Sequence, residues 1–473
     1  MDFHGLNETS GSHRTFRPGW RNKPRNPSSP LDPPRDSRSA YPEMKSRFAI
    51  LLLALSLPTL AKEAPALPPE LSAYQLAPAP EPTGLLLQKG DRVAICGDSI
   101  TEQKRYSVIL ETYLTACLPE LEITCRQYGW SGEQAGGFLK RMESDVLRFK
   151  PTFATTCYGM NDFRYVPYNE PVAAEYRKNQ TAMVQSFKQA GTRVLLGSSG
   201  IIDTVPNWVK TASGTKEELN LALSRFRNIG IEVAAAEKVA FADLYRPMLL
   251  ADFQAEKLHG PAFMLAGKDG VHPGWAGQLI MAYSFLTGMG LDGDLGTITF
   301  DAATGKATAT AGHEVISAAD GKLTIRSTKL PFSAGPGDVK SDDSMRAGLA
   351  LVPFDDRLNR LVLKIAAPAA TAYDVTWGES TRTYQATALQ AGVNLAKDFE
   401  THPLLPAFTK VWDAVLAKQS YETRQIRTLV HGPEGAADLE ATFALTEKVR
   451  AKLAKAVADA KQPAEHVITI KAK

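Results

Sequence analysis

Apolar and polar residues alternate with two different periods between residues 90 and about 290. Short apolar runs have the length of buried strands, and they are separated by longer stretches whose apolar residues recur at helical spacing. The runs predict strands over residues 92–96, 123–128, 153–157, 193–199 and 239–244. The longer stretches predict helices over residues 106–118, 133–149, 175–190, 216–238 and 275–286. This alternation is typical of a parallel sheet with helices on both faces.

The pattern changes after Gly293. Residues 297–327 alternate between apolar and polar positions with turn signals between them, which predicts antiparallel β structure. A loop is expected over 333–344 and further strands over 360–377. Residues 393–461 have helical spacing, and the last predicted helix carries an apolar stripe that is expected to face the core: Leu439, Phe443, Val449, Leu453 and Val457.

These patterns divide most of the chain into an α/β domain (90–294), a β-rich region (295–392) and a helical C-terminal region (393–473). A chain of 473 residues with 44% hydrophobic content can build a full core and more than one domain. Whether the two C-terminal regions form a separate domain or pack back over the α/β domain stays open.

The first 43 residues contain seven prolines and no apolar periodicity, so they are expected to be a disordered lead or an over-extended start. Met44 is followed by basic residues and by an apolar run, 48–60, that is too short to span a bilayer. Residues 44–61 therefore predict a signal peptide, with a core strand or an uncleaved anchor as the alternative. Residues 62–89 form a Pro-rich lead-in. We expect a secreted or periplasmic protein without stable membrane insertion.

Removing residues 1–61 changes the charge balance, because they hold nine of the 54 Lys and Arg but only five of the 51 Asp and Glu. The remaining chain has a net charge of about −1. This near-neutral balance gives no sign of nucleic-acid binding and suits small or uncharged substrates.

The chain has four cysteines, all before residue 160. An exported protein can form disulfides, and a bridge between Cys117 and Cys125 stays open as an expectation. Cys96 and Cys157 lie in apolar, strand-like runs and are expected to be buried thiols. Because the sequence has no Cys-x-x-Cys pair and no Cys/His cluster, we expect no bound metal.

The run VAICGDSITE, residues 93–102, carries the first candidate for chemistry. It puts the hydroxyl of Ser99 directly after a predicted buried strand, at the carboxyl end where open α/β sheets bind their ligands. Gly97 permits the sharp exit from the strand that this position requires. Ser99 is therefore a candidate nucleophile, although glycine, aspartate and serine after a strand also make an ordinary turn.

A serine nucleophile needs a base within hydrogen-bond reach and a group that orients the base. His272 lies in the loop KDGVHPGWAGQ, with Asp269 three residues before it. This spacing lets one loop present an imidazole together with a carboxylate that fixes its tautomer. The alternative is a surface histidine in a helix-entry turn.

Two further loops follow predicted strands, YGWSGEQ with Gly132 and YGMNDFRY with Asn161. Both are expected at the same edge of the sheet as Ser99, because parallel strands share their carboxyl edge. The N–H of an exposed glycine and the amide of an asparagine can both donate to a developing oxyanion. Each residue is also common in ordinary turns.

The order of the blocks GDSI, GWSG, GMND and DGVH resembles the SGNH (GDSL-type) hydrolase superfamily over roughly residues 91–288. The resemblance implies a three-layer α/β/α, flavodoxin-like fold and ester hydrolysis without a metal or organic cofactor. By position, it implies that Ser99 is the nucleophile, His272 the general base and then acid, and Asp269 the orienting carboxylate.

The same resemblance implies an oxyanion hole made of the N–H groups of Ser99 and Gly132 and the amide of Asn161. Ile100 stands where many members have leucine, and Gly129 stands where asparagine is frequent. The sequences GDSITEQKRY, GWSGEQAGGF and GMNDFRY look like those of an exported bacterial clade with a long C-terminal extension. Several residues flank these loops without an assigned role: Thr101, Glu102, Gln103, Arg105, Trp130, Glu133, Arg164 and Tyr165.

The sequence thus predicts a serine esterase that acts through an acyl-enzyme on a small-molecule or glycan ester. Removal of a small acyl group such as acetyl from a carbohydrate is the preferred activity. A lipase or thioesterase-type acyl hydrolase stays open as an alternative, as does a non-catalytic protein that binds a glycan or a partner. The oligomeric state is not predicted.

Overall fold

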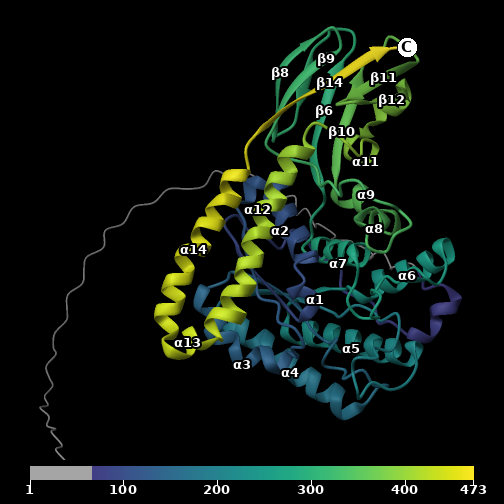
Figure 1. The fold of residues 1–473 in the computed structure, drawn as a ribbon. Helices are drawn as coiled ribbons and strands as arrows, with labels where there is room; N and C mark the ends of the chain where they lie inside the picture. Colours follow the sequence, from purple (N-terminus) through teal and green to yellow (C-terminus); the bar gives the residue numbers. More distant parts are fainter. Residues whose placement is uncertain (1–65) are drawn as a thin grey trace, which may run out of the picture. The chain divides into compact units, whose positions relative to one another are not determined.

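The computed structural model of the protein describes residues 66–473 (Figure 1). The predicted lead (1–43) and signal peptide (44–61) lie outside the described residues. Within the described part of the chain, no helix is both long enough and apolar enough to cross a membrane. A short 3-10 helix, η1 (Pro69–Tyr74), lies in the predicted lead-in.

Five parallel strands form the central sheet, as predicted. Their order is β2-β1-β3-β4-β5. Their bounds are β1 Arg92–Gly97, β2 Thr124–Gln127, β3 Phe153–Cys157, β4 Arg193–Gly197 and β5 Ala240–Ala242. Every residue of β3, and all of β1 after its first residue, is buried, as in a sheet that is covered on both faces.

Helices cover both faces of this sheet (Figure 1). On one face, α2 (Tyr106–Ala116) contacts α7 (Trp275–Gly288). On the other face, α4 (Glu170–Gln189) contacts both α3 (Ala135–Asp145) and α5 (Lys216–Glu237). The predicted three-layer α/β/α fold is therefore confirmed.

The sequence pattern does not predict α6 (Tyr245–His259), which follows β5. Its buried face includes Asp252, whose carboxylate lies 3.2 Å from Nζ of Lys216. A charged residue on the inner face interrupts the apolar spacing on which the prediction depends. Three shorter elements complete this domain: α1 Ser99–Glu102, η2 Pro119–Leu121 and η3 Leu147–Phe149.

Two further sheets follow the α/β domain. One has the order β13-β10-β6-β7, and the other has the order β12-β11-β14-β9-β8. The strands up to residue 394 are β6 Asp294–Asp301, β7 Ala307–Ala309, β8 His313–Ala319, β9 Lys322–Ser327, β10 Arg360–Ala366, β11 Ala372–Trp377, β12 Ser380–Gln385 and β13 Val393–Asn394. The short helices between and after them are α8 Met345–Leu351, α9 Phe354–Leu358, α10 Ala386–Ala391 and α11 Leu395–Asp398.

The antiparallel prediction for residues 297–327 is correct for the pairs β6–β7 and β8–β9. It is incomplete, because β6 also pairs in parallel with β10. A parallel neighbour requires a long crossover connection, so the local alternation of β6 cannot reveal it.

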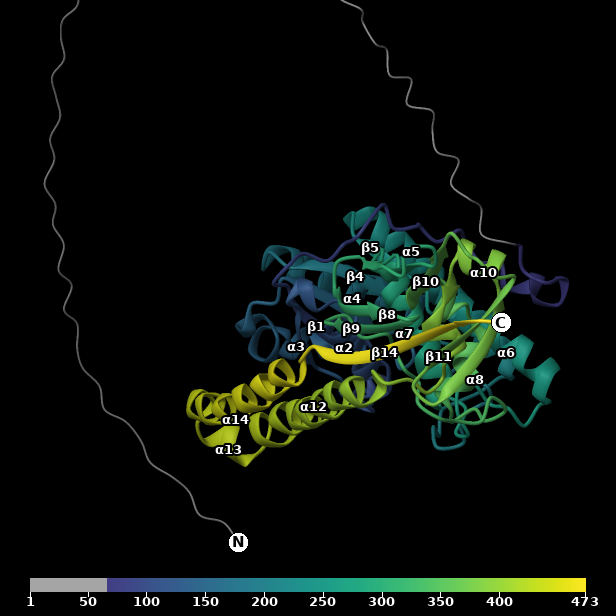
Figure 2. The ribbon, with the colours of Figure 1, turned by 90° about the horizontal axis from the view of Figure 1, so that it is seen from above.

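The C-terminal region consists mainly of a helical hairpin, α12 to α14, in which α12 and α14 lie side by side (Figures 1 and 2). We call this segment the C-terminal hairpin. Its elements are α12 Leu405–Arg424, the π-helical turn η4 Gln425–Val430, α13 Pro433–Ala437 and α14 Leu439–Ala460.

The prediction that the C-terminal region is helical is wrong for its last residues, which form strand β14 (Ala464–Ala472). This strand lies in the middle of the second β-rich sheet, between β9 and β11. His466, Ile468 and Ile470 are buried and alternate with more exposed residues, which is the two-residue period of a strand.

The apolar stripe predicted on α14 faces the core only in part. Phe443 and Val457 are buried, whereas Leu439 and Val449 are 37% and 43% exposed. Because α14 packs mainly along α12, only a narrow strip of its surface is covered.

The C-terminal hairpin satisfies the outer edge of β2, which among residues 66–473 has no strand partner on that side. A carboxylate oxygen of Glu422 accepts the backbone N–H of Gln127 at 3.1 Å. The carbonyl of Cys125 accepts hydrogen bonds from Nζ of Lys418 at 2.9 Å and from Nη2 of Arg450 at 3.1 Å. Side chains of the C-terminal hairpin therefore stand where a further strand would pair.

All four cysteines are free and buried. The bridge between Cys117 and Cys125, which the sequence leaves open, is therefore not formed. Cys96 and Cys157 lie inside β1 and β3, as expected for buried thiols.

Candidate active site

The chain turns sharply at the carboxyl end of β1, where Ser99 begins the short helix α1. Asp98 caps this helix, because its carboxylate accepts the N–H of Ile100 at 3.0 Å. A Cβ on Gly97 would lie 2.1 Å from the hydroxyl of Thr101, so only glycine lets α1 fold back against the strand. Ser99 is left partly exposed at the edge of the sheet.

The loop before α7 presents His272 and Asp269 together. One carboxylate oxygen of Asp269, Oδ1, accepts the backbone N–H groups of Val271 and His272 at 3.0 and 2.9 Å. Its second oxygen, Oδ2, lies 2.6 Å from Nδ1 of His272. Asp269 therefore holds both the loop and the imidazole.

The structure brings this loop to Ser99, with Nε2 of His272 2.7 Å from the Ser99 hydroxyl oxygen. Partial burial acts to raise the pKa of Asp269, but hydrogen bonds from His272 and Val271 outweigh it and leave that pKa below its ordinary value. Asp269 is therefore an anion at neutral pH. An anion at this place favours the tautomer whose Nδ1 carries the proton, which leaves Nε2 free to accept one from serine.

Residues 130–133 form a tight turn after β2, which we call the 130–133 turn. It is closed by a hydrogen bond from the N–H of Glu133 to the carbonyl of Trp130 at 3.1 Å. Gly132 has φ +74°, the left-handed region that the third position of this kind of turn requires and that favours glycine. The Gly132 N–H makes no hydrogen bond to any residue between 66 and 473 and is available to a ligand.

Asn161 lies in the loop after β3 and is linked to the 130–133 turn. Its amide nitrogen donates to the carbonyl of Glu133 at 3.2 Å, which leaves a second amide hydrogen. The neighbouring Asp162 accepts the N–H of Ala135 at 3.0 Å and so fixes this loop to the start of α3. The two candidate oxyanion donors, Gly132 and Asn161, thus belong to one connected group of loops.

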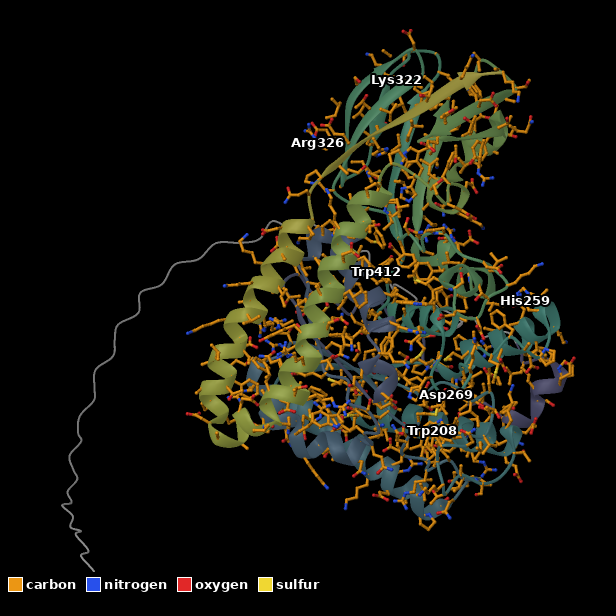
Figure 3. The ribbon with its side chains drawn as sticks, viewed as in Figure 1. Trp208, His259, Asp269, Lys322, Arg326 and Trp412 are labelled. Carbon is orange, nitrogen blue, oxygen red and sulfur yellow. The ribbon has the colours of Figure 1, made fainter. Side chains whose placement is uncertain are left out.

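Two aromatic residues of the site carried no role in the sequence-based prediction. The Tyr165 hydroxyl donates to Oδ1 of Asn161 at 3.1 Å. The ring centroid of Trp208 lies 5.7 Å from that of Tyr165 and 5.9 Å from that of His272. Trp208 is 48% exposed, and Figure 3 labels it near Asp269. Trp208 lies in the loop that follows β4. This position at the carboxyl edge of the sheet is the signal by which the sequence could have indicated that Trp208 belongs to the site.

Chemically, the arrangement combines a serine hydroxyl, an imidazole oriented by a carboxylate, and donors at the same edge of the sheet. These are the groups needed for acyl transfer through a covalent intermediate. Among residues 66–473, no group of three or more His, Cys, Asp or Glu side chains is arranged to hold a metal ion.

Residues 95–280 match the family model described as GDSL-like Lipase/Acylhydrolase. The matched range contains Ser99, the 130–133 turn, Asn161, Asp269 and His272. None of the curated proteins matches the chain.

One similar solved structure is BT4096, a gut microbial diltiazem-metabolizing enzyme, with 22% identity over 84% of this chain and 99% of its own, and a TM-score of 0.65. This likeness shows a shared fold that extends beyond the α/β domain. Axe2, an acetylxylan esterase from Geobacillus stearothermophilus, is 24% identical over 44% of this chain and 97% of its own, with a TM-score of 0.36. Since the family match contains Ser99, Asp269, His272 and the loops that carry Gly132 and Asn161, residues 95–280 form a GDSL-like lipase/acylhydrolase domain of the SGNH type, and the protein is an ester hydrolase of that type.

Proposed function

We propose that the protein is a serine esterase in which Ser99 is the nucleophile, His272 the general base and acid, and Asp269 the orienting carboxylate. The observation that carries this proposal is the pair of contacts made by His272. Its Nε2 lies 2.7 Å from Oγ of Ser99, and its Nδ1 lies 2.6 Å from Oδ2 of Asp269. Contacts of this length suit a nucleophile and a base between which a proton is to move.

In the first step, the Ser99 oxygen attacks the ester carbonyl carbon while Nε2 of His272 takes the hydroxyl proton. The tetrahedral intermediate collapses as the bond to the alcohol oxygen breaks, and His272 returns its proton to the departing alcohol. Water then attacks the acyl-enzyme by the same route, which releases the acid and restores the Ser99 hydroxyl.

The negative charge that develops on the carbonyl oxygen needs donors aimed at that position. We assign this role to the N–H groups of Ser99 and Gly132 and to the second amide hydrogen of Asn161. The free N–H of Gly132 and the bond between Asn161 and Glu133 support this assignment.

We further propose that the substrate is a carbohydrate carrying a small acyl group such as acetyl, and that the protein acts after export. Two surfaces, one beside His272 and one at the 130–133 turn, support a sugar as the alcohol. The half-exposed ring of Trp208 offers an apolar face next to His272. An open polar groove begins at the 130–133 turn and is lined further on by Gln134, Gly136, Gly137, Lys140, Glu175 and Asn179.

A panel of esters tests the substrate class. We expect hydrolysis of acetylated mono- and oligosaccharides and of p-nitrophenyl acetate, with rates that fall steeply from acetate to butyrate to octanoate. Rates that rise with acyl length would contradict the proposal and favour the lipase or thioesterase alternative. A complete lack of hydrolysis would favour a non-catalytic binding protein.

Replacing Trp208 by alanine is expected to raise the KM for an acetylated sugar about threefold to tenfold, because an apolar stacking surface is lost. The KM for ethyl acetate, which has no ring to stack, is expected to change less than twofold. The Trp208→Phe variant keeps a planar ring and serves as the matched control. Equal effects on both esters in Trp208→Ala would exclude a sugar-contacting role.

Replacing Tyr165 by phenylalanine is expected to lower kcat about tenfold. The variant loses the hydrogen bond that fixes the Asn161 carbonyl oxygen, so the amide can rotate and turn its nitrogen away from the oxyanion. The matched control is Tyr168→Phe, since that hydroxyl bonds to Glu170 at the surface. Steady-state rates on p-nitrophenyl acetate give the comparison, and unchanged kcat in Tyr165→Phe would remove Tyr165 from the site.

A further inference from the structure

The C-terminal hairpin reaches the 130–133 turn through a chain of two hydrogen bonds. Nη1 of Arg427, in η4, donates to Oε1 of Glu102 at 2.5 Å. The other carboxylate oxygen of Glu102 accepts the backbone N–H of Ser131 at 2.5 Å. Ser131 directly precedes Gly132, so Arg427 is linked through one carboxylate to the Trp130–Ser131 peptide, the neighbour of the peptide whose N–H is a proposed oxyanion donor.

A second contact runs through the side chain of Trp130. Its ring lies between three groups, with the guanidinium of Arg141 5.0 Å and that of Arg427 5.5 Å from the ring centroid. The imidazole of His431, one helical turn after Arg427, meets the same ring edge-on at a centroid distance of 5.0 Å. His431 is itself held by Asp145, with Nε2 2.7 Å from Oδ2 of that fully buried carboxylate.

The contacts are aimed at the first half of the 130–133 turn, where the backbone N–H of Trp130 also donates to the carbonyl of Gly97 at 3.0 Å. Gly132 has no side chain, and its own N–H is unpaired among residues 66–473. Ser131 and Gly132 are both exposed. The position of Ser131 and Gly132 therefore depends on the carboxylate of Glu102, which accepts the Ser131 N–H, and on Trp130, which precedes them in the turn.

We propose that the C-terminal hairpin, through Arg427 and His431, positions the 130–133 turn for stabilisation of the oxyanion. Arg427 and His431 are positioning residues, because they contact Glu102 and Trp130 rather than the substrate. This inference rests on the proposed function, since it assigns a task to the C-terminal region within the same reaction.

Arg427 restrains the carboxylate of Glu102 at one oxygen while the other oxygen holds the Ser131 N–H. Without Arg427, the carboxylate of Glu102 can rotate and the peptide between Ser131 and Gly132 can tilt. Oxyanion donors act only when they lie within hydrogen-bond distance of the developing charge, and a misplacement of about 1 Å can cost up to roughly 100-fold in rate. The substrate's ground state does not depend on this peptide to the same degree, so the effect falls on kcat.

The test compares Arg427→Ala with Arg424→Ala in the full chain, using p-nitrophenyl acetate. Arg424 lies three residues earlier and makes no ion pair with any described residue. We expect kcat to fall at least tenfold in Arg427→Ala with KM changed less than about twofold, and both constants to stay at wild-type values in Arg424→Ala. The Arg427→Lys variant keeps a charge opposite Glu102 and should recover part of the lost rate.

Arg427 and Glu102 can also be compared in a double-mutant cycle. If Arg427 acts through Glu102, the double variant Glu102→Gln/Arg427→Ala should lose no more kcat than Glu102→Gln alone. Because the side chain of Arg427 is 40% exposed, its removal should leave the melting temperature close to the wild-type value. A loss of rate that only follows a lower melting temperature would contradict the proposal.

Failure of the proposed function and failure of the positioning role give different results. If the wild type does not hydrolyse p-nitrophenyl acetate, the proposed function is wrong. If the wild type is active and Arg427→Ala keeps its full kcat, the esterase proposal stands and the positioning role is wrong. Equal losses of kcat in Arg427→Ala and Arg424→Ala would also refute the positioning role, because they would point to the general positive charge of this surface.

Discussion

The Ser99→Ala variant is expected to lose about 10⁵- to 10⁶-fold in kcat for ester hydrolysis, because no acyl-enzyme can form without the hydroxyl. Its fold should be unaffected. The Ser99 oxygen is partly exposed and its side chain bonds to His272 alone among the described residues, so the melting temperature should stay within a few degrees of the wild type. Initial rates on p-nitrophenyl acetate test the loss of kcat, and thermal unfolding tests the unchanged melting temperature.

The control for this variant is Ser72→Ala, which removes an exposed hydroxyl from η1 that bonds to the carbonyl of Pro69. It should keep full activity. Wild-type rates in Ser99→Ala would refute the assigned nucleophile and would favour a protein that binds its ligand without cleaving it.

Replacing Asp269 by asparagine is expected to lower kcat by roughly 10³- to 10⁴-fold with little loss of stability. The asparagine oxygen can still accept the N–H groups of Val271 and His272, so the loop keeps its shape. Its amide NH₂ then faces Nδ1 of His272, which favours the tautomer with the proton on Nε2. An imidazole in that form donates to Ser99 and cannot take its proton.

The measurement is kcat for p-nitrophenyl acetate beside a melting curve, with Asp338→Asn as a control in an exposed loop. A rate within tenfold of wild type in Asp269→Asn would show that another group orients His272. A large drop in melting temperature would show that Asp269 serves the loop more than the reaction.

The sequence predicted the central sheet and singled out the residues of the candidate site because both depend on local patterns. Ser99, Gly132 and Asn161 lie in loops that follow β1, β2 and β3, and parallel strands carry such positions to one edge. The spacing of Asp269 and His272 within one loop was likewise sufficient to predict that they would lie together. The sequence did not predict the distance from His272 to Ser99, which depends on the path of the chain through α6 and the loop before α7.

The remaining features depend on contacts that no local pattern records. Tyr165 and Trp208 meet through the paths of two long loops, and Arg427 reaches Glu102 across more than 300 residues of chain. Strand β14 was missed because a long helix precedes it and its partners, β9 and β11, lie far back in the sequence. In each case the decisive partner is distant, and a single sequence gives no signal for it.

The covered edge of β2 has a consequence for how the protein folds during synthesis. Glu422, Lys418 and Arg450 reach the backbone of this strand only after about 300 further residues have been made. Until then, the edge of the sheet carries open backbone groups that could recruit a strand from another copy. The C-terminal hairpin thus closes the sheet against aggregation, and the α/β domain on its own would carry that liability permanently.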